Sequence, residues 1–278
     1  TLSLNIFFFS TIKVEAKAFE INNVEISKPF EINFNKNRVI DEGFKKAFYD
    51  LIMITVDSKN QKKINKVKLN EIKAMIESFT IKEEKFVKDV YHVKLGVSFN
   101  KKKFFNYLEK KNIFPSVPNK KKFLFVPIII DENKKNLLTL YDNKIFNKWN
   151  LNNEKNHLIE YILPTEDIED LELIKKNLKK IEEYNFKDIT NKYDLKNSII
   201  TLIFKNEKNV RILSRITIKD KINLTNQSFF NINMNKDKDI EIVINDLKNI
   251  YEDYWKNSNQ INTSIKLPLT LELKNFEN

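Results

Sequence analysis

The sequence predicts an α+β fold with two domains, each a mixed or mainly antiparallel sheet with helices packed on it. Three observations predict this class. The 278 residues suit one large or two ordinary domains, and hydrophobic residues at 41% are sufficient to fill a core. Segments of helical period are interleaved with segments in which apolar and polar residues alternate. Pro115 and Pro118 break the chain and separate residues 17–114 from residues 120–278.

Periodicity predicts the elements of the first domain in order: one or two strands in Phe19–Phe34, a helix over Arg38–Thr55, a polar loop over Lys59–Lys68, a helix over Leu69–Phe79, a strand over Val90–Phe99 and a helix over Lys101–Lys111. The strand over Val90–Phe99 is the clearest of these, because Tyr91, Val93 and Leu95 alternate with polar residues and give one apolar face. Asn100 is expected to cap the helix that follows.

The second domain is predicted to begin with a strand over Phe123–Ile130 that is covered on both faces, because its apolar run is almost unbroken. Pro127 lacks a backbone donor and fits best at an edge or a bulge. The elements expected next are a helix from Asn136 to Trp149, a strand over Leu158–Leu163, a helix to Lys180 capped by Thr165 or Asp167, a short helix over Ile189–Tyr193, a hairpin of Ser198–Phe204 and Val210–Ile218, a strand over Phe229–Met234, a helix over Ile240–Lys256 and a strand over Ile265–Leu273.

The formal charge of +11 raises the question of a polyanionic partner. Of the 49 basic residues, however, only Arg38, Arg211 and Arg215 are arginine. Base and phosphate recognition favours the planar guanidinium fork over the lysine ammonium. We therefore interpret most lysines as solvent-facing residues and expect no nucleic-acid ligand.

Several kinds of site are excluded or disfavoured by composition. The chain has no cysteine, which excludes disulfides, thiolate zinc sites and thiol nucleophiles. With only Gly43 and Gly96, it has no glycine-rich phosphate loop. His92 and His157 lie far apart and lack the spacing of metal ligands. No cofactor and no metal ion are predicted.

The first residues indicate export. Leu2–Ile12 is an apolar stretch of the length found in secretory signals, and small residues follow it at Ala16 and Ala18. We expect residues 1–16 to be a truncated signal peptide that is cleaved after Ala16 or, second, after Ala18; an ordinary buried strand is the alternative. The mature chain is expected to have no transmembrane segment and to be periplasmic.

The order of the elements resembles an uncharacterised family of exported bacterial proteins, catalogued as domain of unknown function twenty sixty-six. The segments that carry the resemblance are RVIDEGFKKAFYDLIMIT, VKLGVSFNKKKFFNYLEKKNI, KFLFVPIIID, ILPTEDIEDLELI and NKYDLKNSIITLIF. They form a pattern of hydrophobic blocks without a catalytic signature, and the pattern departs from the family at Asp57 and Asn112, where glycine is often found. More weakly, the element order of the second half is similar to the amino-terminal domain of TolB and to outer-membrane activators of penicillin-binding proteins, which implies an interaction module.

The acidic stretch 166–172 contains the candidate carboxylates Asp167 and Asp170. Paired carboxylates bind divalent cations or act as acid and base in hydrolases. Acidic residues are equally favoured in the first turn of a helix, where they meet unpaired amides. We favour the second interpretation.

Two sets of basic residues are candidates for an anion or partner contact. Lys101, Lys102 and Lys103 begin a predicted helix, where amides and ammonium groups together attract anions. The favoured alternative is that coding drift towards AT-rich codons has filled these exposed positions with lysine without a specific function. Arg211 and Arg215 are four residues apart on a predicted strand and face the same side. They either pair with acids of a neighbouring helix or form a contact patch.

The favoured function is that of a non-enzymatic periplasmic interaction module or envelope accessory, whose partner is another protein or an envelope component. A hydrolase that uses the acidic stretch is the second hypothesis. A polyanion-binding module is the third.

Overall fold

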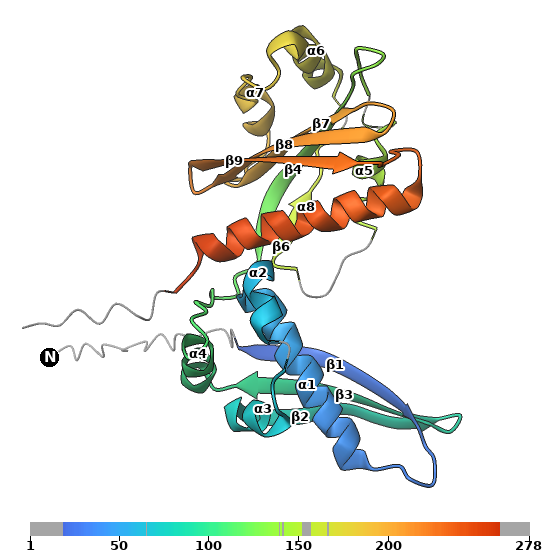
Figure 1. Ribbon diagram of the computed structural model, residues 1–278, viewed down its shortest axis with the longest axis vertical. Coiled ribbons are helices and arrows are strands. Elements are labelled where there is room, and N and C mark those ends of the chain that lie inside the picture. Colours follow the sequence, from blue (N-terminus) through green and yellow to red (C-terminus); the bar gives the residue numbers. More distant parts are fainter. Residues whose placement is uncertain are drawn as a thin grey trace, which may run out of the picture. The chain divides into compact units, whose positions relative to one another are not determined.

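The computed structural model describes residues 19–64, 66–138, 140, 142–151, 157–165 and 167–261. These residues contain eight α-helices and nine strands, which confirms the α+β class. The chain folds into two compact units (Figure 1). The first comprises the described parts of Thr1–Leu51 and Lys68–Phe104, and the second those of Ile52–Val67 and Phe105–Asn278. The expected signal segment 1–16 and the expected strand Ile265–Leu273 lie outside the described residues.

The first unit contains a three-stranded antiparallel sheet in the order β1-β3-β2. Its elements are β1 (Glu20–Pro29), most of α1 (Lys36–Thr55), α3 (Leu69–Met75), β2 (Ile76–Val87), β3 (Val90–Phe99) and the start of α4 (Lys101–Glu109). The alternation predicted for β3 is confirmed, because Tyr91, Val93 and Leu95 are buried. Gly43 of α1 lies so close to β3 that a β-carbon there would overlap the side chain of Leu95.

Strand β2 corrects the sequence prediction, which extended a helix to Phe79. The helix ends at Met75, and a strand of 12 residues begins at Ile76. Almost all of β2 is exposed, so its lysine and glutamate side chains hide the period of two that a half-buried strand shows. Phe79 nevertheless packs against Phe44 of α1, with ring centroids 5.0 Å apart.

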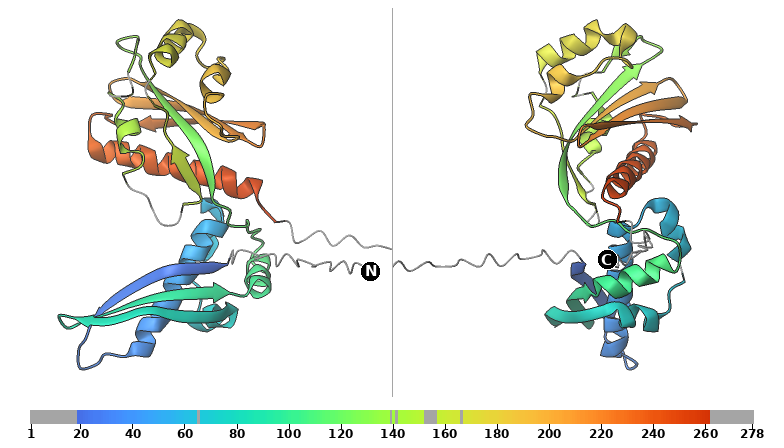
Figure 2. Two further views of the ribbon diagram at one scale, coloured as in Figure 1. Left: turned by 180° about the vertical axis from the view of Figure 1, so that it is seen from behind. Right: turned by 90° about the vertical axis from the view of Figure 1, so that its left-hand side faces the viewer.

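The second unit contains a mixed six-stranded sheet in the order β5-β4-β7-β8-β9, with β6 also paired to β4. Its strands are β4 (Lys121–Asp131), β5 (Asn136–Leu137), β6 (Ile159–Ile162), β7 (Ser198–Lys205), β8 (Asn209–Ile218) and β9 (Lys221–Phe230). Its helices are the ends of α1 and α4, with α2 (Ser58–Gln61), α5 (Lys144–Lys148), α6 (Ile168–Lys176), α7 (Lys187–Thr190) and α8 (Asp237–Ser258). Helix α8 covers one face of the sheet and α6 with α7 cover the other (Figures 1 and 2).

Strand β4 is buried on both faces, as predicted. Its odd-numbered residues, such as Phe125, pack in the cluster that includes α8. Its even-numbered residues, such as Val126, pack in the cluster below α6 and α7. β4 is not an edge strand, because β7 pairs with one side of it along most of its length. On the other side, β6 pairs with the start of β4 and β5 with its end, and Pro127 lies in the gap between them. No strand there needs the N–H that proline lacks, and the Pro127 carbonyl accepts a hydrogen bond from Asn143 Nδ2 at 3.0 Å.

Two further predictions for the second unit were wrong. The helix expected from Asn136 is the short strand β5 followed, from Lys144, by α5, which Asn143 caps by accepting from Phe146 N at 3.0 Å. The strand expected over Phe229–Met234 is the end of β9, which begins at Lys221. β9 was misplaced because its exposed face carries apolar residues, so burial does not follow polarity along it.

The unit boundary differs from the one that the prolines predict. The described part of 52–67, which was expected in the first domain, belongs to the second unit, where Val56 and Ser58 contact α8. Ser58 N donates to Asp253 Oδ1 at 2.9 Å, and Lys256 Nζ donates to Val56 O at 3.2 Å. The predicted polar loop also contains a turn of helix, α2, because Asp57 caps it by accepting from Asn60 N at 2.8 Å.

Candidate functional site

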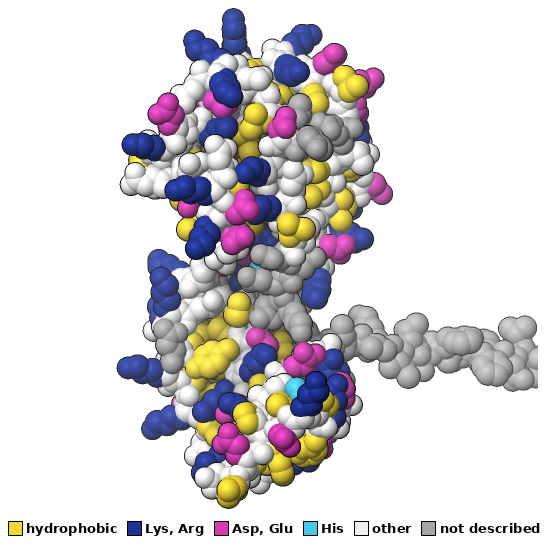
Figure 3. Space-filling model, turned by 90° about the vertical axis from the view of Figure 1, so that its right-hand side faces the viewer, with side chains coloured by type: hydrophobic (Ala, Val, Ile, Leu, Met, Phe, Trp, Pro, Cys, Tyr) yellow, Lys and Arg dark blue, Asp and Glu magenta, His cyan; other side chains and the backbone are white. Residues whose placement is uncertain are grey.

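Lys101, Lys102 and Lys103 lie in the first turn of α4 and are exposed. Asn100 Oδ1 accepts from Lys103 N at 3.0 Å, so the predicted cap is confirmed and one of the free amides already has a partner. Lys101 Nζ lies 5.8 Å from the centroid of the Phe19 ring. On the face that Figure 3 shows, basic side chains are scattered among acidic and apolar ones in each unit. This scatter favours the solvent-facing interpretation of the lysines.

Arg211 and Arg215 both contact the segment that precedes α7. Arg211 Nη2 pairs with Glu182 Oε1 at 2.6 Å, and its guanidinium carbon lies 4.1 Å from the centroid of the Phe204 ring. Arg215 donates to the carbonyl oxygens of Tyr184 at 2.6 Å and of Glu182 at 3.0 Å. The pair thus attaches residues 182–184 to one face of β8. Only the Arg211 charge is opposed by a carboxylate in these contacts.

The candidate acids Asp167 and Asp170 are brought together by a lysine that the sequence pattern did not single out. Lys192 Nζ lies 2.6 Å from Asp167 Oδ2 and 2.7 Å from Asp170 Oδ1. Asp167 also caps α6, because its Oδ1 accepts from Glu169 N at 2.9 Å. Glu166, in the same acidic stretch, lies outside the described residues. The contacts link the start of α6 to the chain just after α7.

The ionisation of this acidic cluster follows from these contacts. The hydrogen bond from Lys192, followed by that from the Glu169 amide, lowers the pKa of Asp167. The bonds to Asp167 and Asp170 raise the pKa of Lys192. A general acid needs the opposite change, a carboxyl pKa raised towards neutrality. The geometry therefore favours the capping and ion-pair interpretation of the acids.

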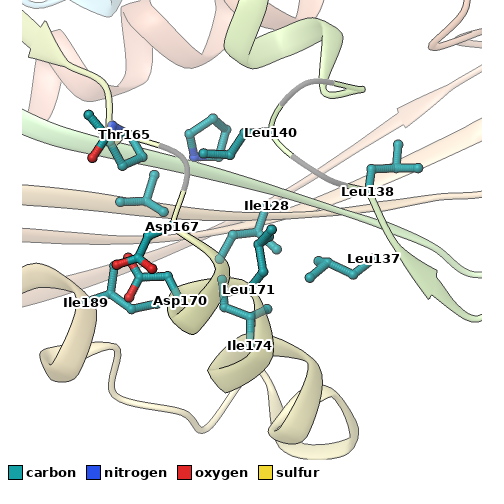
Figure 4. A pocket seen from close by; sticks show the side chains of 13 residues that line it. Ile128, Leu137, Leu138, Leu140, Thr165, Asp167, Asp170, Leu171, Ile174 and Ile189 are labelled. Carbon is teal, nitrogen blue, oxygen red and sulfur yellow. The ribbon is translucent and has the colours of Figure 1, made fainter.

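A small pocket lies beside the acidic cluster, between β4 and α6 (Figure 4). Leucine, isoleucine and proline side chains form most of its wall, and Asp167 and Asp170 lie together at one end. Its volume is about 30 Å³, which accommodates one or two water molecules. A substrate of ordinary size needs about 300 Å³ or more, so this pocket does not support the hydrolase hypothesis.

A row of buried charges on α8 escaped prediction from the sequence. Lys248, Glu252 and Lys256 are spaced four residues apart and are 4%, 3% and 6% exposed. Glu252 accepts hydrogen bonds from Leu158 N at 3.1 Å and from Ile159 N at 2.8 Å. Burial raises the pKa of Glu252 and lowers the pKa of Lys256. The spacing of four residues places the three side chains on one face of the helix, and this was the available signal for a buried charged row. It was overlooked because charged residues on an amphipathic helix ordinarily face water.

Strand β9 presents a second feature that the sequence did not reveal. It is an edge strand, because no described strand pairs with its outer side. Ile222 and Leu224 are each 61% exposed and Phe230 is 71% exposed. All three project from the same face of β9, since they are separated by even numbers of residues. We call these residues and the unpaired side of β9 the β9 edge.

The scan against protein-family models and the search of curated proteins find no match for this chain. The described residues contain no cluster of three or more histidine or acidic side chains placed to hold a metal ion. No helix in the described part of the chain is long and apolar enough to cross a membrane. The candidates for function therefore come from the geometry of the surface.

We predict that Lys192→Met lowers the urea midpoint of unfolding at pH 7, because Asp170, whose side chain is only 10% exposed, loses its ammonium partner. The Asp167 contribution is present above about pH 3.9 and is lost as the pH falls through the lowered pKa of the folded state. The Lys192 contribution is present below about pH 10.4 and is lost at higher pH. The difference between variant and wild type should therefore shrink below about pH 3.

Lys196→Met removes a nearby exposed lysine and serves as the matched control. Equal effects of the two substitutions would contradict the structural role of Lys192. A divalent-metal affinity in the micromolar range that disappears in the Asp167→Asn/Asp170→Asn double variant would restore the catalytic or metal-binding interpretation.

Proposed function

We propose that this protein is a non-enzymatic interaction module of the cell envelope that binds a partner protein along the β9 edge. The observation that carries the proposal is the unpaired strand with an exposed apolar row beside it. An edge strand offers free amide and carbonyl groups to an incoming strand. Main-chain hydrogen bonds then supply affinity, and alternate side-chain contacts supply specificity.

The exposed apolar row supports the proposal energetically. Ile222 and Leu224 retain most of their surface in contact with water. Complete burial of such a side chain contributes about 1.5–3 kcal/mol, before the entropy of association is subtracted. A few such contacts together with a row of main-chain hydrogen bonds are sufficient for a specific, moderate affinity.

The charge around the edge favours an acidic, extended segment of another protein as the occupant. Lys219 immediately precedes β9 and Lys221 is its first residue. Arg215 of β8 is the cross-strand neighbour of Leu224, so its positive charge lies next to the apolar row. Arg215 donates to the carbonyl oxygens of Tyr184 and Glu182, and neutral carbonyl groups do not cancel its charge. A second copy of a chain with a net charge of +11 would meet the same sign of charge.

Photo-crosslinking in cells tests the β9 edge. We predict that benzoylphenylalanine at position 224 and at position 230 yields an adduct with the same protein, because both side chains project from one face. An additional Ile222→Lys substitution should reduce the yield several-fold, because it places a charge within the apolar row.

Ile242 provides the matched control, since it is 56% exposed on α8, which covers the opposite face of the sheet. No adduct is expected from position 242. Adducts that form equally from positions 224, 230 and 242, or from none of them, would refute the β9 edge as the contact surface. An adduct with a second copy of the chain would refute the acidic partner.

We also propose that the protein acts in the periplasm. The apolar stretch Leu2–Ile12 and the resemblance to an exported family support this location. Fractionation of the full-length tagged protein should recover it in the periplasmic fraction, with the signal removed. Retention in the cytoplasm would contradict export and would favour the polyanion-binding hypothesis instead.

A further inference from the structure

A second exposed apolar surface lies at one end of the first unit. The loop between β1 and α1 and the turn between β2 and β3 form it, and the two segments lie side by side (Figures 1 and 2). Phe30 N donates to Asp89 O at 2.7 Å and joins them. We call residues 30–34 together with residues 86–89 the apolar tip.

The tip exposes large apolar side chains. Ile32 is fully exposed, Phe86 and Phe30 are 57% and 52% exposed, and Val87 is 45% exposed. The rings of Phe30 and Phe86 touch across the two segments, with centroids 5.2 Å apart. Single exposed apolar residues are ordinary, whereas a contiguous group of them marks a binding surface.

The fold keeps these side chains out of the core. Tyr91 of β3 is fully buried at the inner side of the ring cluster. The ring centroids of Phe86 and Phe34 each lie 5.0 Å from that of Tyr91, and the Phe30 ring lies 4.9 Å from that of Phe34. Because Tyr91 already occupies the inner position, Phe30 and Phe86 cannot withdraw below the surface. The tip is therefore formed before any partner arrives.

The shape of the tip favours a lipid surface over a protein. Ile32 is fully exposed, so it protrudes from the loop instead of lining a groove. A protein partner would need a recess of matching shape, because specific protein interfaces are packed as tightly as protein interiors. The boundary between lipid headgroups and acyl chains adapts to a protruding apolar side chain and buries it.

The charge around the tip is balanced. Residues 28–36 and 83–91 contain four lysines and four acidic residues. Three of these lysines form ion pairs, which are Lys28 with Glu42 at 2.9 Å, Lys36 with Glu84 at 2.6 Å and Lys85 with Glu83 at 2.8 Å. A strongly charged partner gains little from such a surface. A zwitterionic lipid surface, whose own charges cancel, is compatible with it.

Glu31 limits how deeply the tip can enter a bilayer. It lies between Phe30 and Ile32 and is exposed. A charged carboxylate is costly in the hydrocarbon interior and tolerated among hydrated headgroups. The tip therefore suits the headgroup boundary, where phenylalanine and other large apolar side chains are buried to a shallow depth.

We propose that the apolar tip binds the surface of a lipid bilayer, with Phe30, Ile32 and Phe86 inserted at the headgroup boundary of zwitterionic lipids. So small an apolar group gives weak, reversible binding. The tip belongs to the first unit and the β9 edge to the second. The proposal therefore goes beyond the protein contact at the β9 edge and does not depend on it.

A single label at position 32 tests insertion. The chain has no cysteine, so Ile32→Cys accepts one environment-sensitive fluorophore. On addition of phosphatidylcholine vesicles, its emission should shift to the blue and increase several-fold, because the label leaves water. The same label at Ile242→Cys, an exposed position on α8, is the control and should keep the emission that it has in water.

Sedimentation of the unlabelled chain with the same vesicles measures the affinity. Ile32→Asp should weaken binding about 10-fold or more, and Phe86→Ser about 3- to 10-fold, because buried apolar surface is lost. Glu31→Gln should strengthen binding about 3-fold, because a charge is removed from the boundary. Ile242→Asp is the control and should bind normally. Every variant keeps the apolar stretch Leu2–Ile12, so differences between variants report on the tip.

Two outcomes of these measurements support the proposal together. Ile32→Asp should keep the melting temperature of the wild type, because Ile32 is fully exposed. Its loss of vesicle binding is then a loss of contact and not of folding. Binding of the wild type to phosphatidylcholine should also change by less than about 2-fold when the salt is raised from about 0.15 M to about 0.5 M, because the ions that screen charge do not weaken apolar burial.

Four outcomes would overturn the proposal. The first is that phosphatidylcholine vesicles do not bind the chain, and the second is that Ile32→Asp binds them as tightly as the wild type. The third is binding only to anionic vesicles that high salt abolishes, which would trace the effect to the net charge of +11. The fourth is self-association without vesicles that Ile32→Asp abolishes, which would identify a second copy of the chain as the occupant.

Discussion

Burial of β4 on both faces is the constraint on which the second unit depends. An apolar strand of this kind needs a layer of helix on each side. Both β6 and β7 lie parallel to β4, and parallel strands require crossover connections instead of tight turns. The segments between these strands supply α5, α6 and α7, and the chain adds α8 after the hairpins. The two core clusters on either side of β4 follow from this arrangement.

The same constraint decides which edges of the sheet are closed. On the β6 side, side chains from other elements bind the backbone: Asn150 binds Tyr161 O, Glu252 binds Ile159 N and Asn143 binds Pro127 O. On the β9 side, no described strand pairs with the outer backbone. The helices are already engaged in covering the sheet faces. Among the described residues, the apolar row of β9 therefore stays exposed.

The parts of the fold that were predictable are those in which burial follows a period. In β3, in β8 and in α8, apolar residues recur at the spacing of the element and do lie inside. β7 instead is a continuous run that is buried on both faces. The exposed strands β2 and β9 were missed or misplaced because burial does not mark them. The turns that connect β2 to β3 and β8 to β9 were also not recognisable in the sequence. Lys88-Asp89 and Lys219-Asp220 adopt positive φ at both positions, a conformation that Asn-Gly or Asp-Gly usually signals.

The candidate sites divide in a similar way. The sequence identified Asp167 and Asp170 through the acidic stretch 166–172 at the start of a predicted helix, and Arg211 and Arg215 through the rarity of arginine. Their partners Lys192 and Glu182 are distant in sequence and could not be paired without the fold. The contact of Glu252 on α8 with the amides of Leu158 and Ile159 was not predictable at all, because it depends on a convergence of α8 with β6 that no local pattern encodes.

Amide hydrogen exchange on the isolated chain tests the central claim, that the β9 edge is open. The amides of β4 and β7 should exchange slowest, since both strands are buried and paired on two sides. Roughly half of the β9 amides, those that face away from β8, should exchange at least about 10-fold faster than the β7 amides. If all β9 amides are instead as protected as those of β7, the edge is already covered and cannot be the free binding surface.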